Sequence, residues 1–364
     1  MIKIYEPYKI DKSIRVIEDC ILNSRLTFQN EEHSIAKTKL QKLHNQKYII
    51  PVFNGTCATH LTYKVLKNRL PNLKTILVPN NVYVAAWNSM LFDGDKINLV
   101  PVDADINTWC VDTTKLSDEI SKRDPETTAV LIVHNLGNIV NVPKLKRKHP
   151  EVLFIEDNCE GFLGKYEGYL SGTKCLASSI SFYANKTITC AEGGAIIVNN
   201  DEDFHFINRI HSQGQTEKRY VHDVLAYNYR MTNLQAVLLS SQLDVVEEIQ
   251  QKKQEIFEKY RNNLDKKFIF QQSEKDTEHS NWMLSVRIKG LDYHKEFDQS
   301  IGFETRPMFY PISKHEHLKK YSTERDESVA TTLSKECFML PSHPNLSEEQ
   351  LDFIIKKLNG FING

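Results

Sequence analysis

The chain has 364 residues, of which 40% are apolar and 26% charged, and these ordinary globular values argue against disorder and fibrous repeats. Its 46 Lys and Arg residues against 47 Asp and Glu residues give a formal net charge of −1, which argues against a general nucleic-acid-binding protein. No apolar run approaches the roughly 18 residues of a membrane-spanning helix, and the first residues do not resemble a signal peptide. We therefore expect a cytoplasmic protein of about two domains, with neither a nucleic acid nor a membrane as its partner.

Over the first two thirds of the chain, short runs rich in Val and Ile alternate with amphipathic stretches. The runs are too continuous to be apolar on one side only, which is typical of strands buried on both faces. We expect strands at Tyr48–Phe53, Thr75–Pro79, Ile97–Val102, Ala129–His134, Val152–Glu156, Ser178–Tyr183 and Gly194–Val198. We expect helices at Ala58–Lys67, Val82–Phe92, Thr113–Ser121 and Pro143–Lys148. This alternation predicts an α/β domain with a mainly parallel seven-stranded sheet, which binds ligands at the carboxyl ends of its strands.

The pattern changes near Thr232. The stretch Leu234–Leu264 has helical spacing throughout and predicts one long helix, of the kind that often links domains. A strand at Met283–Ile288 and a helix at Ser347–Leu358, which opens with an S-E-E-Q capping signal, follow it. We therefore predict a large α/β domain over residues 1–240, and a linking helix with a small α+β domain over residues 241–364.

Two strand ends carry residues that suit chemistry. Lys186 follows the strand Ser178–Tyr183 and precedes an E-G-G turn, where burial can make a lysine amine nucleophilic; the alternative is a solvated surface lysine. Asp157 ends a wholly apolar strand, where its carboxylate can hold a proton on a pyridine nitrogen; the alternative is a helix cap or an ion-pair partner.

Three further segments offer parts of a ligand site. The run N-G-T-C-A-T-H from Asn54 to His60 is a strand–Gly–helix junction, whose free amides suit a phosphate, although ordinary capping also explains it. It fits neither a Walker A loop nor a dinucleotide fingerprint, so ATP and NAD are disfavoured. Tyr83 or Trp87 can stack on a flat ring, but such aromatics more often lie in a core. Asn228 and Arg230 can meet an anion, or can belong to a charged loop.

Metal binding is not expected. The seven cysteines show no C-x-x-C pairing, and the H-E-H run at 315–317 has no further spaced ligand. In contrast, a phosphate cradle, a stacking aromatic, a strand-end Asp and a strand-end Lys, in this order on one sheet, are the parts that a pyridoxal phosphate site requires.

At this point the sequence resembles the DegT/DnrJ/StrS family of sugar-nucleotide aminotransferases, which share the type I aspartate-aminotransferase fold. The resemblance covers nearly the whole chain. Its most specific segments are N-G-T-C-A-T, P-N-N-V-Y-V-A-A-W-N, H-N-L-G, I-E-D-N-C-E, S-F-Y-A-N-K-T-I-T-C-A-E-G-G and Y-N-Y-R-M-T-N-L-Q-A. In one departure, Ala191 stands where a glycine commonly precedes E-G-G.

The resemblance implies a role for each matching residue. It makes Lys186 the Schiff-base lysine, Asp157 the partner of the pyridine nitrogen, and Glu160 the polar residue beside the ring of pyridoxal 5′-phosphate. It further implies a phosphate site at Thr56, the amide of Cys57, and Ser181, with Tyr83 stacked on the ring. Asn228, with Arg230 close behind, matches a residue that reaches the phosphate from the neighbouring subunit, so a homodimer is implied. Arg306 and Tyr310, in T-R-P-M-F-Y-P, are implied contacts of the nucleotide-sugar.

The implied reaction moves an amino group from L-glutamate to a nucleotide-linked keto-deoxysugar. The sequence after Lys186 resembles members that aminate a 4-keto-6-deoxyhexose, as in perosamine or viosamine synthesis. Three alternatives stay open: 3-amination of a keto-deoxysugar, a pyridoxal-phosphate-dependent sugar 3-dehydratase, and a non-catalytic sensor with the same fold. The dehydratases replace the lysine with histidine, so Lys186 favours amination.

Overall fold

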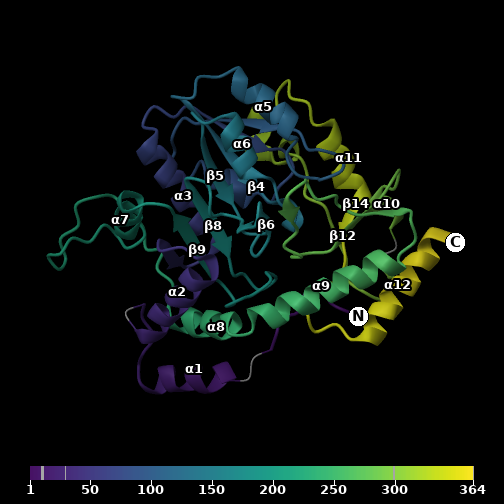
Figure 1. Ribbon diagram of the computed structural model, residues 1–364, viewed down its shortest axis with the longest axis horizontal. Helices are drawn as coiled ribbons and strands as arrows, with labels where there is room; N and C mark the ends of the chain where they lie inside the picture. Colours follow the sequence, from purple (N-terminus) through teal and green to yellow (C-terminus); the bar gives the residue numbers. More distant parts are fainter. Residues whose placement is uncertain (10–11, 29, 298–299, 364) are drawn as a thin grey trace.

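The computed structural model describes residues 1–9, 12–28, 30–297 and 300–363, and a seven-stranded sheet lies at its centre (Figure 1). The strand order is β1-β9-β8-β5-β4-β2-β3; only β9 runs antiparallel to its neighbours in this sheet. The predicted mainly parallel sheet is confirmed, and the expected strands differ from the observed ones only at their ends. The bounds are β1 (Ile49–Val52), β2 (Thr75–Pro79), β3 (Asn98–Val102), β4 (Thr128–Val133), β5 (Leu153–Asp157), β8 (Ala177–Ser181) and β9 (Gly194–Val198).

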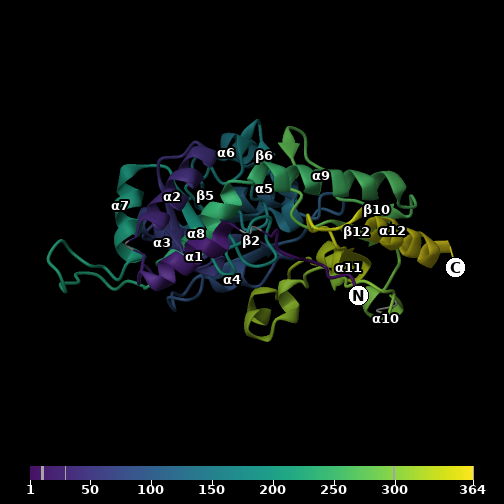
Figure 2. The same ribbon diagram turned by 90° about the horizontal axis from the view of Figure 1, so that it is seen from below.

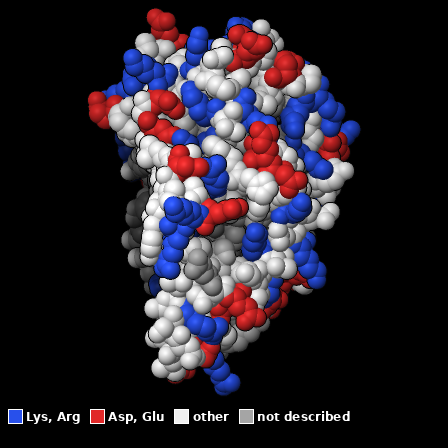
Figure 3. Space-filling model, turned by 90° about the vertical axis from the view of Figure 1, so that its left-hand side faces the viewer, with Lys and Arg blue, Asp and Glu red and all other residues white. Residues whose placement is uncertain are grey.

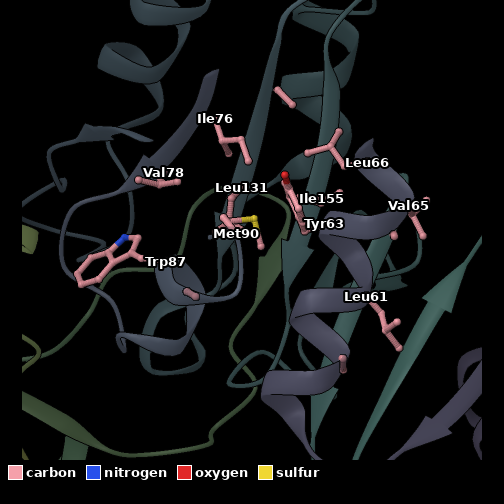
Figure 4. Close-up of a cluster of buried hydrophobic side chains, with 14 of the residues drawn as sticks. Leu61, Tyr63, Val65, Leu66, Ile76, Val78, Trp87, Met90, Leu131 and Ile155 are labelled. Carbon is pink, nitrogen blue, oxygen red and sulfur yellow. The ribbon is translucent and has the colours of Figure 1, made fainter. Parts of the chain in front are cut away.

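Helices cover both faces of this sheet, which is why its strands are continuously apolar. On one face, α3 (Gly55–Arg69) packs Leu61 and Val65 into a cluster with Val78 and Ile155 of the strands (Figure 4). On the other face, α5 (Thr113–Ser121) and α6 (Val142–Lys148) pack onto residues of β2, β4 and β5. The helices α1 (Lys12–Leu22), α2 (Glu31–His44) and α7 (Asp201–Ile210) complete this half of the molecule.

The expected single helix over Leu234–Leu264 is wrong in one respect, because the chain forms two helices, α8 (Asn233–Leu243) and α9 (Val246–Asn263). The break lies at Val245, whose φ of −123° and ψ of 17° are not helical, and whose N–H donates to the carbonyl of Gln242 at 3.2 Å. Val245 and Val246 both pack against the same apolar cluster. Consecutive residues of a continuous helix do not share one face, so packing both of them interrupts the helix.

The expected helix over Val82–Phe92 is also shorter than predicted, since only α4 (Ala85–Asn88) is α-helical. Beyond it, the N–H groups of Met90 and Leu91 donate to carbonyls three residues back rather than four. The segment then turns at Gly94, whose φ is +73°. The apolar residues that suggested a longer helix fill the core from these tight turns instead.

A second core lies around a four-stranded sheet of order β10-β12-β14-β13. Residues of α9 and α12, among them Phe257 and Ile354, pack on this sheet, while Leu243 and Ile249 pack on the seven-stranded sheet. The segment α8–α9 thus serves both cores, and the division of the chain at residue 240 stays a prediction. The bounds are β10 (Phe268–Ile269), β12 (Ser285–Ile288), β13 (Arg306–Pro307), β14 (Cys337–Met339), α10 (Tyr293–Glu296), α11 (Ser328–Glu336) and α12 (Glu348–Asn363).

The remaining short elements are a small sheet of β6 (Lys165–Tyr166), β7 (Tyr169–Leu170) and β11 (Thr277–Glu278), and the 3₁₀ turns η1 (Asn135–Gly137), η2 (Ile312–Lys314) and η3 (Glu316–Tyr321). The capping signal before α12 is confirmed, because Ser347 and Gln350 exchange side-chain and backbone hydrogen bonds at 3.0 and 3.2 Å. Within the described residues, no helix has the length and apolar character needed to span a membrane.

One segment departs from the body of the molecule. After α7 the chain runs out and back as an arm over residues 212–227, visible in two perpendicular views (Figures 1 and 2). Two apolar side chains of this arm are strongly exposed, Tyr220 at 78% and Leu225 at 90%. On the face that carries α7, positive and negative side chains are interspersed (Figure 3).

Candidate active site

Two neighbouring strands end side by side at the candidate site. Asp157 is the last residue of β5 and Ser181 the last of β8, and the two strands pair in parallel with Asp157 opposite Ser179. Both side chains are buried, Asp157 at 7% and Ser181 at 6% exposure. Asp157 Oδ1 accepts the N–H of Cys159 at 3.0 Å, which fixes the carboxylate at the start of the following turn. The strand edge therefore presents an acid and a hydroxyl close together.

The start of α3 lies directly against this edge. A Cβ on Gly55 would come within 2.7 Å of the Cβ of Ser181, and a Cβ on Gly194 within 2.5 Å of the backbone of Asn54. Glycine at both positions is thus what lets the helix start approach the sheet. Because α3 has 15 residues and its first amides lack partners within the helix, this end attracts an anion. Thr56 and Ser181 are then the predicted phosphate ligands on its two sides.

One predicted phosphate donor has another partner. The N–H of Cys57 donates to the side-chain oxygen of Asn54 at 2.9 Å, as the N-cap interaction of α3. The amides of Gly55 and Thr56, which precede it, are the ones left facing away from the helix.

Lys186 is not a solvated surface lysine, because its side chain is only 13% exposed. Its Nζ lies 3.9 Å from Oε1 of Glu160 and 3.9 Å from the centroid of the Trp282 ring. Glu160 belongs to the turn that begins at Asp157, so Lys186 and Glu160 lie beside the strand edge that carries Asp157 and Ser181.

Burial dominates the electrostatics of Glu160. Its carboxylate is 6% exposed, and this loss of hydration raises its pKa to about 7, although Lys186 and the backbone N–H of Leu136 favour the charged form. The Leu136 N–H donates to Oε2 at 2.7 Å from the turn η1, where Leu136 has a φ of +57°. A carboxyl group poised near neutrality beside a lysine is suited to holding or releasing a proton.

Behind this turn lies a buried network that the sequence did not reveal. Glu156, on the opposite face of β5 from Asp157, accepts from His134 Nε2 at 2.7 Å, from the Tyr166 hydroxyl at 3.1 Å and from the Gly172 N–H at 2.9 Å. A Cβ on Gly161 would approach His134 to 2.7 Å, so the turn after Asp157 rests on this histidine. The network fixes the turn that carries both acids. In the sequence, His134 ends an apolar strand and opens the segment H-N-L-G, but neither feature indicates a hydrogen bond to Glu156.

Of the two candidate stacking aromatics, Trp87 lies in the core, with 0% exposure and its Nε1 donating to the carbonyl of Pro79 at 2.9 Å. Tyr83 is 60% exposed, and its ring lies 6.0 Å from that of Phe309. It follows β2 at the same carboxyl edge of the sheet, where a flat ligand can reach it. The structure therefore favours Tyr83 over Trp87 as the stacking residue.

Of the two predicted substrate residues, Arg306 lies on β13, at the edge of the four-stranded sheet, and Tyr310 follows in the next loop. Arg306 pairs with Glu304 at 3.2 Å and lies 5.3 Å from the ring of Tyr5. Tyr310 is 40% exposed and stacks on His294, with ring centroids 5.3 Å apart. Neither contacts Lys186. The loop that carries them is fastened near Tyr83, because the N–H of Ile312 donates to Asn80 Oδ1 at 3.0 Å and to its backbone carbonyl at 3.1 Å.

The segment of Asn228 and Arg230 runs beside the end of β1, because Arg230 forms a β-bridge with Val52 and the N–H of Phe53 donates to the carbonyl of Tyr229 at 2.7 Å. Asn228 and Arg230 lie at the base of the arm, where Arg230 Nε donates to Asn228 Oδ1 at 3.0 Å and the guanidinium lies 4.4 Å from the ring of Phe28. Asn228 is exposed. Their part in a site shared between two copies of the chain stays a prediction.

The family model described as the DegT/DnrJ/EryC1/StrS aminotransferase family matches residues 9–359. A GDP-perosamine synthase of Vibrio cholerae is 30% identical over 375 residues, which cover 100% of both chains. A GDP-perosamine synthase of Escherichia coli is 29% identical over 369 residues, covering 99% of this chain and 98% of that one. Among solved structures, PseC of Helicobacter pylori, an aminotransferase involved in the biosynthesis of pseudoaminic acid, has a TM-score of 0.90 at 21% identity and covers 99% of this chain and 98% of its own.

Proposed function

Because the chain belongs to the DegT/DnrJ/EryC1/StrS aminotransferase family, we propose that it moves an amino group from L-glutamate to the 4-keto group of a nucleotide-linked 4-keto-6-deoxyhexose. The observation that carries this proposal is the placement of Lys186 beside Glu160, at the strand edge that ends in Asp157. The names of the two GDP-perosamine synthases, matched over nearly their whole length, favour a GDP-linked sugar.

The residues at the strand edge fit pyridoxal phosphate, the cofactor of this family. The close approach of Gly55 to Ser181, with the helix start above it, is a cradle that an added Cβ would fill, and it suits a phosphate. Asp157 would hold a proton on the pyridine nitrogen, and Tyr83 would cover the ring. When bound, the cofactor supplies an electron sink for the substrate carbon. Lys186 moves the proton at that carbon, acting as general base and acid.

Two side chains on and after β13 are suited to the sugar-nucleotide. Arg306 offers a guanidinium for a diphosphate, once the bond to Glu304 yields. Tyr310, half-exposed beside His294, offers an aromatic face. Both lie on the loop fastened at Asn80, next to Tyr83, so a substrate bound there would extend from the strand edge toward the second core.

We further propose that the working unit is a homodimer in which Asn228 and Arg230 serve the partner's site. The arm that begins beside them (Figure 2) carries the exposed side chains Tyr220 and Leu225, which offer apolar surface to a second copy. The exposed apolar side chains of α1, Ile14 and Leu22, add to the surface available for a second copy.

A reducing compartment such as the cytoplasm is also proposed. All seven cysteines of the chain carry free thiols.

The substrate is tested with a panel of nucleotide-linked 4-keto-6-deoxysugars carrying GDP, dTDP or UDP, each incubated with glutamate. We expect amine formation at carbon 4, most rapid with GDP, and complete loss of turnover in Lys186→Ala. Turnover of a 3-keto sugar instead would contradict the proposed position of amination. Loss of a hydroxyl without gain of nitrogen would identify a dehydratase.

The shared site is tested by mixing Lys186→Ala and Asn228→Ala proteins. If the subunits exchange Asn228, a mixed dimer contains one site with both native residues, so about a quarter to a half of the native activity should return. Each variant alone is the control. No recovery in mixtures that demonstrably contain mixed dimers would contradict a shared site.

A further inference from the structure

The segment 280–283, which precedes β12, is clamped onto the site by three hydrogen bonds. The N–H of Ser280 donates to the carbonyl of Gly137 at 2.8 Å, and its hydroxyl donates to the carbonyl of Glu160 at 2.7 Å. The indole N–H of Trp282 donates to the carbonyl of Asn185 at 2.9 Å. The segment therefore fixes its position against both Glu160 and the residue before Lys186.

The close approach at Gly137 shows how tightly this segment is seated. A Cβ on Gly137 would come within 2.4 Å of the Ser280 hydroxyl oxygen, and its φ of +96° is one that other residues rarely adopt. The neighbouring residue Leu136 donates its N–H to Glu160. One turn thus positions Glu160 on one side and the tryptophan-bearing segment on the other.

The result is a small enclosure for a cation. The Trp282 ring is 4% exposed and lies 3.9 Å from Lys186 Nζ, while Oε1 of Glu160 lies at the same distance from that nitrogen. A buried ammonium group needs a counter-charge or an equivalent partner, and the face of a tryptophan is the most favourable aromatic partner for it.

We propose that Trp282 and Glu160 form a docking site that holds the free ammonium group of Lys186 whenever the lysine carries no cofactor. Trp282 is then a positioning residue, which keeps the amine at the strand edge. This inference rests on the proposed function, because it assumes that Lys186 is the reactive lysine.

Other ionisable groups lie near the ammonium group of Lys186. Cys159 and Asp157 lie on the turn that carries Glu160. A small cavity that Lys186 and Trp282 help to line is also lined by Glu6, Lys253 and His343. The test therefore changes only Trp282 and Glu160 and keeps the pH constant.

The first measurement uses protein freed of cofactor. Trinitrobenzenesulfonate is added at pH 8, and modification of Lys186 is followed by peptide mass spectrometry. In Trp282→Leu the lysine should react about two- to fivefold faster, the equivalent of about 0.5–1 kcal/mol of lost cation–π attraction. Glu160→Gln, which leaves the indole in place and so does not open the enclosure, should also accelerate the reaction. Trp282→Phe should stay closer to the native rate because it keeps an aromatic face.

Trp87→Phe is the matched control, because Trp87 is also buried and also donates its indole N–H to a backbone carbonyl at 2.9 Å. It should leave the labelling rate of Lys186 unchanged. Native rates in both Trp282→Leu and Glu160→Gln would overturn the docking site. If Trp282→Leu does not fold, Glu160→Gln decides the question, and a native labelling rate in that variant overturns the docking site.

The second measurement adds pyridoxal phosphate to the same proteins and follows the visible absorption band of the lysine-bound cofactor. We expect the Trp282→Leu protein to reach the same final absorbance with an altered rate of formation. A normal rate would count against the docking site while leaving the proposed function intact. Absence of the band in the native protein would contradict the proposed function itself.

Discussion

At the scale of single residues, Glu160 shows what burial does to a carboxyl group. Loss of hydration raises its pKa to about 7 from an ordinary value of 4.5. The folded protein therefore favours the protonated group. The raised pKa of Glu160 contributes stability that is fully present below pH 4.5 and is lost as the pH rises through 7. The loss begins near pH 4.5 because the carboxyl group ionises in the unfolded chain before it does so in the folded protein.

From this we predict the behaviour of Glu160→Gln in cofactor-free protein. Glutamine is uncharged and still accepts the Leu136 N–H, so it removes the penalty of a buried charge. We compare the free energy of unfolding of the variant and of the native protein by urea denaturation. The difference in favour of the variant should be larger at pH 8 than at pH 5 by about 1–3 kcal/mol. An equal difference between the two proteins at both pH values would contradict this account.

Ala191 offers a second prediction at this scale. Its φ of +71° lies in the left-handed region, and it stands where the resembled family commonly has glycine. A left-handed alanine costs about 1–2 kcal/mol, whereas glycine loses about 0.5–1 kcal/mol of chain entropy on folding. Ala191→Gly should therefore stabilise the protein by about 0.5–1 kcal/mol, seen as a higher urea midpoint. A lower midpoint would show that the turn before Gly193 is not strained.

Whether a site residue could be predicted from the sequence depends on what positions it in the fold. Asp157 and Lys186 are positioned by strands that are recognisable from their apolar runs, so both could be predicted as strand-end residues. Trp282 reaches the site through long-range packing and belongs to no local pattern that indicates a ligand. His134 opens the segment H-N-L-G, but its hydrogen bond to Glu156 depends on the packing of two strands. The hydrogen bond from the Cys57 N–H to the side chain of Asn54 likewise depends on the conformation of Asn54, which the sequence alone does not give.

At the scale of elements, the approach of α3 to β8 determines the phosphate cradle. Gly55→Ala would place a Cβ 2.7 Å from that of Ser181 and 3.2 Å from the sulfur of Cys159. Because the nearest atom is close to the backbone, the helix start must move. We expect at least a tenfold weaker affinity for pyridoxal phosphate, measured by equilibrium dialysis.

The matched control is Gly360→Ala in α12, where an added Cβ meets no atom within 4 Å. Alanine is the better helix former, so this variant should gain about 0.5–1 kcal/mol of stability and bind the cofactor normally. Equal affinities in the two variants would show that the start of α3 does not form the cradle.

The errors in the predicted elements have a common cause. The stretch 234–264 has helical spacing on both sides of Val245, and 82–92 has apolar residues enough for a helix. In each case, burial of side chains in the core outweighs the continuation of the helix, which a local pattern does not record. The strands were predicted closely because burial on both faces leaves a continuous apolar run.

At the scale of the whole molecule, the first residues connect the two cores. The N–H of Ile4 donates to Glu304 at 3.1 Å, the carbonyl of Tyr8 accepts from Gln242 at 2.8 Å, and the carbonyl of Pro7 accepts from Asn345 at 2.9 Å. These contacts join residues more than two hundred positions apart. No periodicity in the sequence indicates these contacts, so how the first residues join the two cores could not be predicted.

Lys253 lies on α9, which serves both cores. Its burial makes the stability of the folded chain depend on pH. It is 4% exposed, its Nζ donates to the carbonyl of Ser342 at 2.8 Å, and loss of hydration lowers its pKa from 10.5 to about 7. The folded state therefore disfavours the ammonium form. The free-energy cost of burying this ammonium group is fully present below pH 7. It disappears as the pH rises toward 10.5, where the unfolded chain also loses the proton.

Lys253→Met keeps the length of the side chain and removes the buried charge, at the cost of one hydrogen bond to Ser342. We expect the variant to be more stable than the native protein at pH 6 by about 1–3 kcal/mol, with the difference falling as the pH approaches 10. Urea denaturation at the two pH values measures this. A difference that grows with pH would show that the ammonium group stabilises the contact between the cores, and that the bond to Ser342 outweighs its burial.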